Sequence, residues 1–165
     1  LTENREGLLK LSAMTPPQKL HLEKAFSESI GEIKETMGNS KWRWYFPDLH
    51  YKLVVLTRNL FDFKEFDRIK DPNHEYYRVY QENLRFLIDE TRTAAQEYRS
   101  KYELSTKEVS DLLFIRRLFE MEKMIHILTG QRDELEKCST ALDSINEKIE
   151  SIMAEKSGGA KKKKK

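Results

Sequence analysis

The four histidines of the chain are the natural starting point, because imidazole serves both acid–base catalysis and metal binding. They are His21, His50, His74 and His126, and they are scattered along the sequence. A di-iron helical bundle needs Glu-x-x-His pairs on two helices, and no histidine here has Glu three positions before it. Glu122 and His126 are four residues apart, which favours a local hydrogen bond on one helix over a metal site. We therefore predict no metal site and no cofactor.

The sequence also lacks the motifs that activate a nucleophile or bind a phosphate. It contains no Gly-x-Ser-x-Gly and no glycine-rich phosphate loop. The single cysteine, Cys138, lies in an apolar series, where cysteine usually acts as a small buried hydrophobic residue. The alternative for Cys138 is a disulfide across a parallel homodimer. We predict that the protein is not an enzyme.

Residues 40–46 form the first candidate binding cluster and contain both tryptophans of the chain. Exposed aromatic side chains beside Lys41 and Arg43 could stack on bases or insert into a protein interface. The structural alternative is a cluster that closes the end of a helical bundle. The candidate contact residues are Trp42, Arg43 and Trp44.

The second candidate is the run of five lysines at the end of the sequence, which could bind polyanions. The residues are Lys161, Lys162, Lys163, Lys164 and Lys165. Adjacent ammonium groups attract nucleic-acid phosphates, acidic lipid headgroups or acidic protein surfaces, and such binding is weak and sensitive to salt. The alternative is a segment that only improves solubility. Without these lysines the net charge of +2 would become −3, which is not typical of a broad nucleic-acid-binding surface.

The composition indicates that long helices must position these residues. Charged residues make up 35% of the 165 residues and hydrophobic residues 38%, with six glycines and four prolines. Such a polar chain with few turn residues is typical of helices with exposed faces. No apolar run is long enough to span a bilayer. We expect a cytoplasmic location; the first residue, Leu1 rather than Met, keeps export after removal of a signal peptide open as the alternative.

Three helices are predicted before residue 103. Thr15-Pro16-Pro17-Gln18 is a strong helix start, and Gly38 ends that helix. A second, very apolar helix begins at Pro47-Asp48 and continues to the break at Asp71-Pro72. The third is expected from about residue 73 to residue 102. Short connections between them favour antiparallel neighbours.

The last predicted helix covers residues 105–156 and organises the rest. Ser105 with Glu108 resembles a capping box. Two interleaved apolar series then recur every seven residues, which is typical of a coiled coil. One contains Met121, Leu128, Leu135, Leu142 and Ile149, and the other contains Met124, Cys138, Ile145 and Ile152. The first half, including Leu112, Leu118, Met124 and Leu128, is expected in the bundle core.

These patterns predict an all-α fold: an antiparallel, up-down-up-down four-helix bundle with a long, partly projecting C-terminal coiled-coil-like helix. The expected parts are an N-terminal arm (1–14), the bundle with its extension (15–156) and a flexible basic tail (157–165). The leading functional hypothesis is a structural or assembly protein, a scaffold or adaptor, that contacts protein partners or other copies of itself. The expected contact residues on the last helix are Leu135, Leu142, Ile145, Ile149 and Ile152. The alternative is a polyanion-binding module that uses the lysine tail and the Trp42–Arg43–Trp44 cluster.

Overall fold

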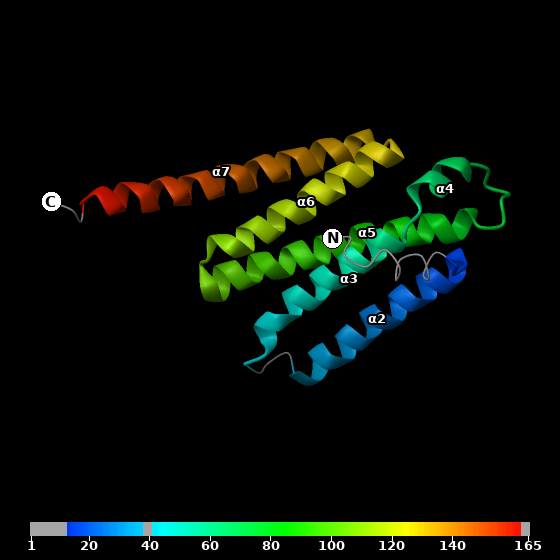
Figure 1. The fold of residues 1–165 in the computed structure, drawn as a ribbon, viewed down its shortest axis with the longest axis horizontal. Coiled ribbons are helices and arrows are strands. Elements are labelled where there is room, and N and C mark those ends of the chain that lie inside the picture. Colours follow the sequence, from blue (N-terminus) through cyan, green and yellow to red (C-terminus); the bar gives the residue numbers. More distant parts are fainter. Residues whose placement is uncertain (1–12, 38–40, 163–165) are drawn as a thin grey trace. The chain divides into compact units, whose positions relative to one another are not determined.

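The computed structural model describes the backbone of residues 13–37 and 41–162 and the side chains of residues 13–37 and 41–155. Within these ranges all regular structure is helical, so the predicted all-α class is confirmed. Six α-helices replace the four that were expected in this part of the chain, and a four-helix bundle is not confirmed. The helices are α2 (Pro16–Met37), α3 (Phe46–Leu60), α4 (Phe63–Arg68), α5 (Tyr77–Lys101), α6 (Val109–Thr129) and α7 (Arg132–Lys162) (Figure 1).

The chain forms two compact units, Leu1–Ala94 and Ala95–Lys165. The first contains α2, α3, α4 and most of α5, and the second contains the end of α5 with α6 and α7. The predicted N-terminal arm lies almost entirely outside the described residues. The boundary falls inside α5, which sequence reasoning treated as one bundle helix.

Helix α2 begins and ends where the sequence predicts. The backbone N–H of Thr15 donates to Oε1 of Gln18 at 2.9 Å, and the Thr15 hydroxyl reaches the same oxygen at 3.1 Å. Gln18 therefore satisfies a backbone donor at the helix start, as the third residue of a capping box does. Proline at the first helical position supports this start, because its fixed φ suits a helix and no N–H is lost there.

The second predicted helix is wrong in its length, because the structure divides it into α3 and α4. The break lies at Phe61, whose backbone is extended. Asp62 then caps α4, and its carboxylate accepts from the backbone N–H groups of Lys64 and Glu65, both at 3.0 Å. An Asp followed three residues later by Glu is a helix-start signal. It was overlooked because the apolar spacing continues on both sides of Asp62.

The core of the first unit lies where α2, α3 and α5 meet. Phe46, Leu53 and Ile30 form one buried cluster, with Leu49 and Phe86 packed against it. A second cluster surrounds the ring of Phe61. Its ring centroid lies 4.6 Å from that of Phe63, 5.5 Å from Phe66 and 5.7 Å from Tyr80.

Helix α6 starts later than predicted. Helix α5 continues into a π-helical turn at Tyr102–Thr106, and Lys107 then takes a left-handed conformation with φ of 51°. Residue Glu108, expected inside the helix, stands just before its first residue. The Thr106 hydroxyl donates to the carboxylate of Asp111 and accepts from the backbone N–H of Glu108. The expected capping box at Ser105 is therefore wrong.

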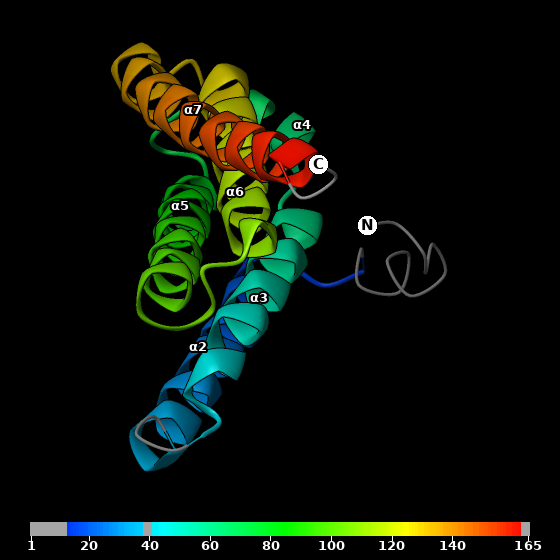
Figure 2. The same cartoon turned by 90° about the vertical axis from the view of Figure 1, so that its left-hand side faces the viewer.

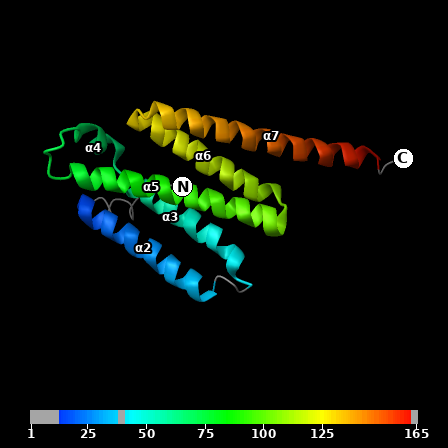
Figure 3. The ribbon, with the colours of Figure 1, turned by 180° about the vertical axis from the view of Figure 1, so that it is seen from behind.

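The single long helix expected over residues 105–156 is also wrong, because Gly130 ends α6. Gly130 has φ of 72°, which is left-handed, and the N–H of Gln131 donates to the carbonyl of His126 at 3.0 Å. Glycine is the usual residue for this helix end because it has no Cβ to clash. Helices α6 and α7 consequently form an antiparallel hairpin and lie side by side (Figures 1 and 3).

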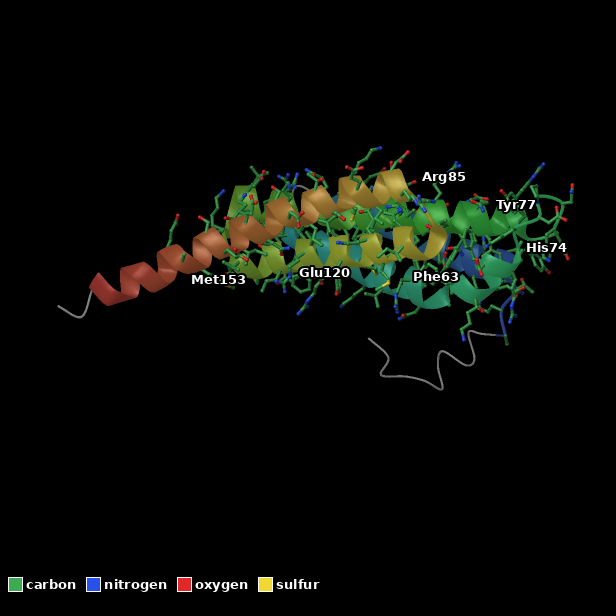
Figure 4. The ribbon with its side chains drawn as sticks, turned by 90° about the horizontal axis from the view of Figure 1, so that it is seen from above. Phe63, His74, Tyr77, Arg85, Glu120 and Met153 are labelled. Carbon is green, nitrogen blue, oxygen red and sulfur yellow. The ribbon has the colours of Figure 1, made fainter. Side chains whose placement is uncertain are left out.

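Projection of the C-terminal helix is limited to its last turns. Helix α7 has 31 residues and α6 has 21, so α7 extends past the start of α6 (Figure 1). Met153, which is 51% exposed, lies near this part of α7 (Figure 4). Helix α7 also includes residues 157–160, which were expected to form a flexible linker. Residues 163–165 of the predicted tail lie outside the described residues.

Substitution of Gly130 by alanine should lower the free energy of unfolding by about 1–2 kcal/mol, because a left-handed conformation is costly for a residue with a Cβ. No atom would meet the new Cβ within 4 Å, so the cost comes from the backbone and not from a clash. Urea unfolding followed by circular dichroism measures the loss. The same change at Gly31, inside α2 and also with open space around it, should instead raise stability. Equal effects at both positions would contradict the helix end at Gly130.

Candidate functional site

The predicted partner-binding residues of α7 mostly face α6. Leu142, Ile145 and Ile149 are buried, and Leu135 and Ile152 are half-buried. These residues pack inside the α6–α7 hairpin, so a partner could reach the buried ones only if the hairpin opened. The seven-residue pattern therefore reflects packing within the chain.

Cys138 belongs to the same seam. It is buried, and its Sγ donates to the backbone carbonyl of Phe119 at 3.2 Å. This agrees with the prediction of a small buried residue. The alternative, a disulfide across a homodimer, would require α7 to leave α6.

The aromatic cluster at residues 42–46 divides into a buried end and an exposed end. Phe46 is buried in the core of the first unit and Trp44 is half-buried, whereas Trp42 and Tyr45 are 43% and 59% exposed. The rings of Trp42 and Tyr45 lie 5.4 Å apart. Phe46 thus helps to close the core, as the structural alternative expected, while a binding role of the exposed rings stays a prediction.

Two cations accompany the exposed end of this cluster. The Lys41 ammonium lies 5.0 Å from the ring centre of Trp42, and the Arg43 guanidinium lies 4.8 Å from that of Trp44. Cations at this distance are attracted to the negative face of the ring. One face of each tryptophan is therefore already occupied by a side chain of the protein.

The second half of α2 adds further exposed apolar residues at the same end of the first unit, where α2 ends and α3 begins (Figure 2). Ile30, Ile33 and Met37 have helical spacing on one face of α2, and of these three only Ile30 is buried. Ile33 and Met37 are 44% and 38% exposed. We call Ile33, Met37, Trp42 and Tyr45 the apolar tip.

A partly buried polar network joins the three helices α2, α3 and α5. Glu90 of α5 accepts from the Ser27 hydroxyl of α2 at 2.7 Å and lies 3.2 Å from Nδ1 of His50 of α3. Burial alone would raise the pKa of Glu90, but the hydrogen bonds from His50 and Ser27 outweigh it and lower that pKa. The serine binds the carboxylate and not the imidazole, so no base activates its hydroxyl. The network ties helices together and resembles no catalytic triad.

The predicted local pairing of Glu122 with His126 is confirmed. Both side chains are buried, and Nε2 of His126 lies 3.3 Å from Oε1 of Glu122. The other ring nitrogen, Nδ1, lies 3.0 Å from Oε1 of Gln131, just beyond the turn at Gly130. In the part of the chain that the structure describes, no three His, Cys, Asp or Glu residues form a group that could hold a metal ion.

Comparison with known proteins identifies the family of this sequence. The TP0443 family profile matches residues 1–153. The chain belongs to the TP0443 family. No curated protein and no solved structure matches the chain. The TP0443 match covers both compact units down to Met153, and the lysine run at residues 161–165 lies outside it.

Helix α6 of this TP0443 family chain carries exposed apolar residues. Met124, Ile127 and Leu128 of α6 are each just over half exposed, although Met124 and Leu128 were expected in the core. Their exposure was missed because α6 is apolar on several faces, so its periodicity cannot show which face is covered.

None of the described helices combines the length and the apolar character that crossing a membrane requires. The polyanion role of Lys161–165 stays a prediction, since those side chains lie outside the description.

Proposed function

We propose that this chain is a non-enzymatic assembly or adaptor protein that binds a protein partner through the apolar tip. The observation that supports the proposal is the exposure of four apolar residues, each at least 38%, within the last turns of α2 and the segment that follows it: Ile33, Met37, Trp42 and Tyr45. Aromatic residues and methionine are enriched at protein interfaces, and a few such residues usually carry most of the binding energy.

The surroundings of the apolar tip favour a protein over a polyanion. The exposed charges of this region have both signs, because Lys34, Lys41 and Arg43 alternate with Glu32 and Glu35. A polyanion-binding surface carries a clear excess of positive charge. The cations beside Trp42 and Trp44 also occupy ring faces on which bases would stack. A mixed rim around apolar residues matches the usual anatomy of a protein interface.

The double substitution Ile33→Glu with Trp42→Ala should abolish most of the capture of that partner from native cell extract by the immobilised full chain. A loss of about 2 kcal/mol or more, roughly thirtyfold in affinity, is expected where an exposed anchor residue is removed. Because Ile33 and Trp42 lie outside the buried core, at 44% and 43% exposure, the free energy of unfolding should stay within about 1 kcal/mol of wild type. Quantitative mass spectrometry of the captured proteins measures the effect.

Leu128→Glu is the matched control, since it places the same charge on an exposed apolar residue of α6. It should leave capture unchanged. Loss of capture with Leu128→Glu but not with the double variant would move the site to α6. The polyanion alternative predicts capture that weakens steeply with salt and disappears on removal of residues 161–165; nuclease-sensitive capture of that kind would contradict the proposal.

A further inference from the structure

Helix α2 is held to the first unit by very few buried residues. Of its 22 residues only Leu20, Glu23 and Ile30 are buried. Leu20 and Ile30 are apolar, but Glu23 is a carboxylic acid with 0% exposure. The protonation state of one side chain therefore bears directly on how α2 is attached.

The carboxyl group of Glu23 makes no hydrogen bond of good geometry in the structure. Neither oxygen of its carboxyl group has a hydrogen-bond partner, and the same holds for Oδ1 of Asn83 and Oγ1 of Thr57, which are also buried. Asn83 lies beside Glu23 closely enough to lower its pKa, yet no bond of good geometry forms. An ionised Glu23 would only add another acceptor. A neutral Glu23 supplies the O–H that an orphaned acceptor such as Oδ1 of Asn83 needs.

Burial raises the pKa of Glu23 from its ordinary value of 4.5 to about 8, against the opposing effects of Asn83 and Lys19. Two pairs of titratable side chains also lie near α2. Lys24 binds Glu82 of α5, and on the α3 side His50 binds Glu90. Glu23 is thus neutral in the folded protein at pH 7, whereas the same residue in an exposed chain is ionised.

A small pocket gives water access to this region. It has space for about one water molecule. Lys19 of α2, Phe61 just after α3, and Tyr80 and Asn83 of α5 contribute to its lining. Burial raises the pKa of Tyr80, one of these lining residues, to about 12, so Tyr80 stays neutral throughout this pH range. Water that reaches Asn83 can exchange protons with the interior next to Glu23.

We propose that α2 is a proton-controlled element: the neutral acid form of Glu23 keeps α2 docked on α3 and α5, and loss of that proton releases α2. The proposal does not depend on any partner, so its test is independent of the test of the proposed function.

The direction of the pH effect follows from proton binding. Between pH 4.5 and about 8 the docked state holds a proton that the released state has lost. The docked state is therefore favoured at low pH and weakens as pH rises, by roughly tenfold in the docking equilibrium for each pH unit in this window. Above about pH 8 both states are ionised and the effect levels off.

Two measurements on the full chain test the proposal. Carbon-13 NMR of glutamate carboxyl groups should show one resonance that titrates near pH 8, and that resonance should be missing in Glu23→Gln. Hydrogen exchange, corrected for intrinsic rates, should show α2 protection falling at least about tenfold from pH 6 to pH 8. In Glu23→Gln, which cannot ionise and keeps a donor, α2 protection should not change with pH.

Either of two results would overturn the proposal. One is the titration of every glutamate of the wild-type chain below pH 6, which requires no variant to fold. The other is a carboxyl group that titrates near pH 8 in the wild-type chain, combined with α2 protection that either does not change with pH or falls with pH as much in Glu23→Gln as in wild type.

Discussion

Replacement of Ile145 by aspartate is expected to unfold the α6–α7 hairpin. Ile145 is 4% exposed and packs in the seam of that hairpin. Removing a buried isoleucine side chain costs about 2–5 kcal/mol, and placing an unpaired carboxylate there adds to this cost. Urea unfolding followed by circular dichroism should show a loss above about 3 kcal/mol, a large part of the stability of a small domain.

Ser144→Asp is the control, because Ser144 is the exposed neighbour on the same helix. It introduces the same charge at the neighbouring position of α7, and the free energy of unfolding should change by no more than about 0.5 kcal/mol. If Ile145→Asp were as well tolerated as Ser144→Asp, the seam would be open to solvent or to a partner. That result would contradict the packing of α7 against α6.

Replacement of Phe61 by alanine should have a comparable effect on the first unit. Phe61 is 6% exposed, and its ring contacts those of Phe63, Phe66 and Tyr80. Truncating a buried phenylalanine costs about 3–5 kcal/mol, and lost ring pairs contribute within that range. Thermal and urea unfolding both measure the loss.

Tyr45→Ala provides the comparison, since it removes an aromatic ring that is 59% exposed. It should change stability by no more than about 0.5 kcal/mol. A large loss from Tyr45→Ala would mean that this end of the apolar tip is part of the core and not an exposed surface.

Helix ends were predictable from sequence where local capping chemistry decides them. The side chain of Gln18 accepts a hydrogen bond from the backbone N–H of Thr15, and Pro16 has no N–H to satisfy. Helix α2 therefore starts at these residues. Gly130 was visible too, but a glycine tolerated inside a helix and a glycine that ends one look the same locally. The heptad series marked the packed face of α7 only, because its α6 members Met124 and Leu128 are just over half exposed.

The candidate site was only partly predictable. Trp42 was found because tryptophan and adjacent cations are conspicuous in sequence. Exposure of Ile33 and Met37 depends on how far α3 and α5 cover α2, which periodicity cannot show. Glu23 carries no sequence signal, because its burial results from the packing of three helices.

Site-specific photo-crosslinking tests the central claim most directly. A photoreactive amino acid is placed at Tyr45 in the apolar tip or, as control, at exposed Asp143 on α7, and the chain is illuminated in its native cells. The proposed function predicts a discrete crosslinked protein from position 45, lost when Ile33→Glu is added, and none from position 143. Equal crosslinking from both positions, or crosslinks from position 45 that survive Ile33→Glu, would contradict it.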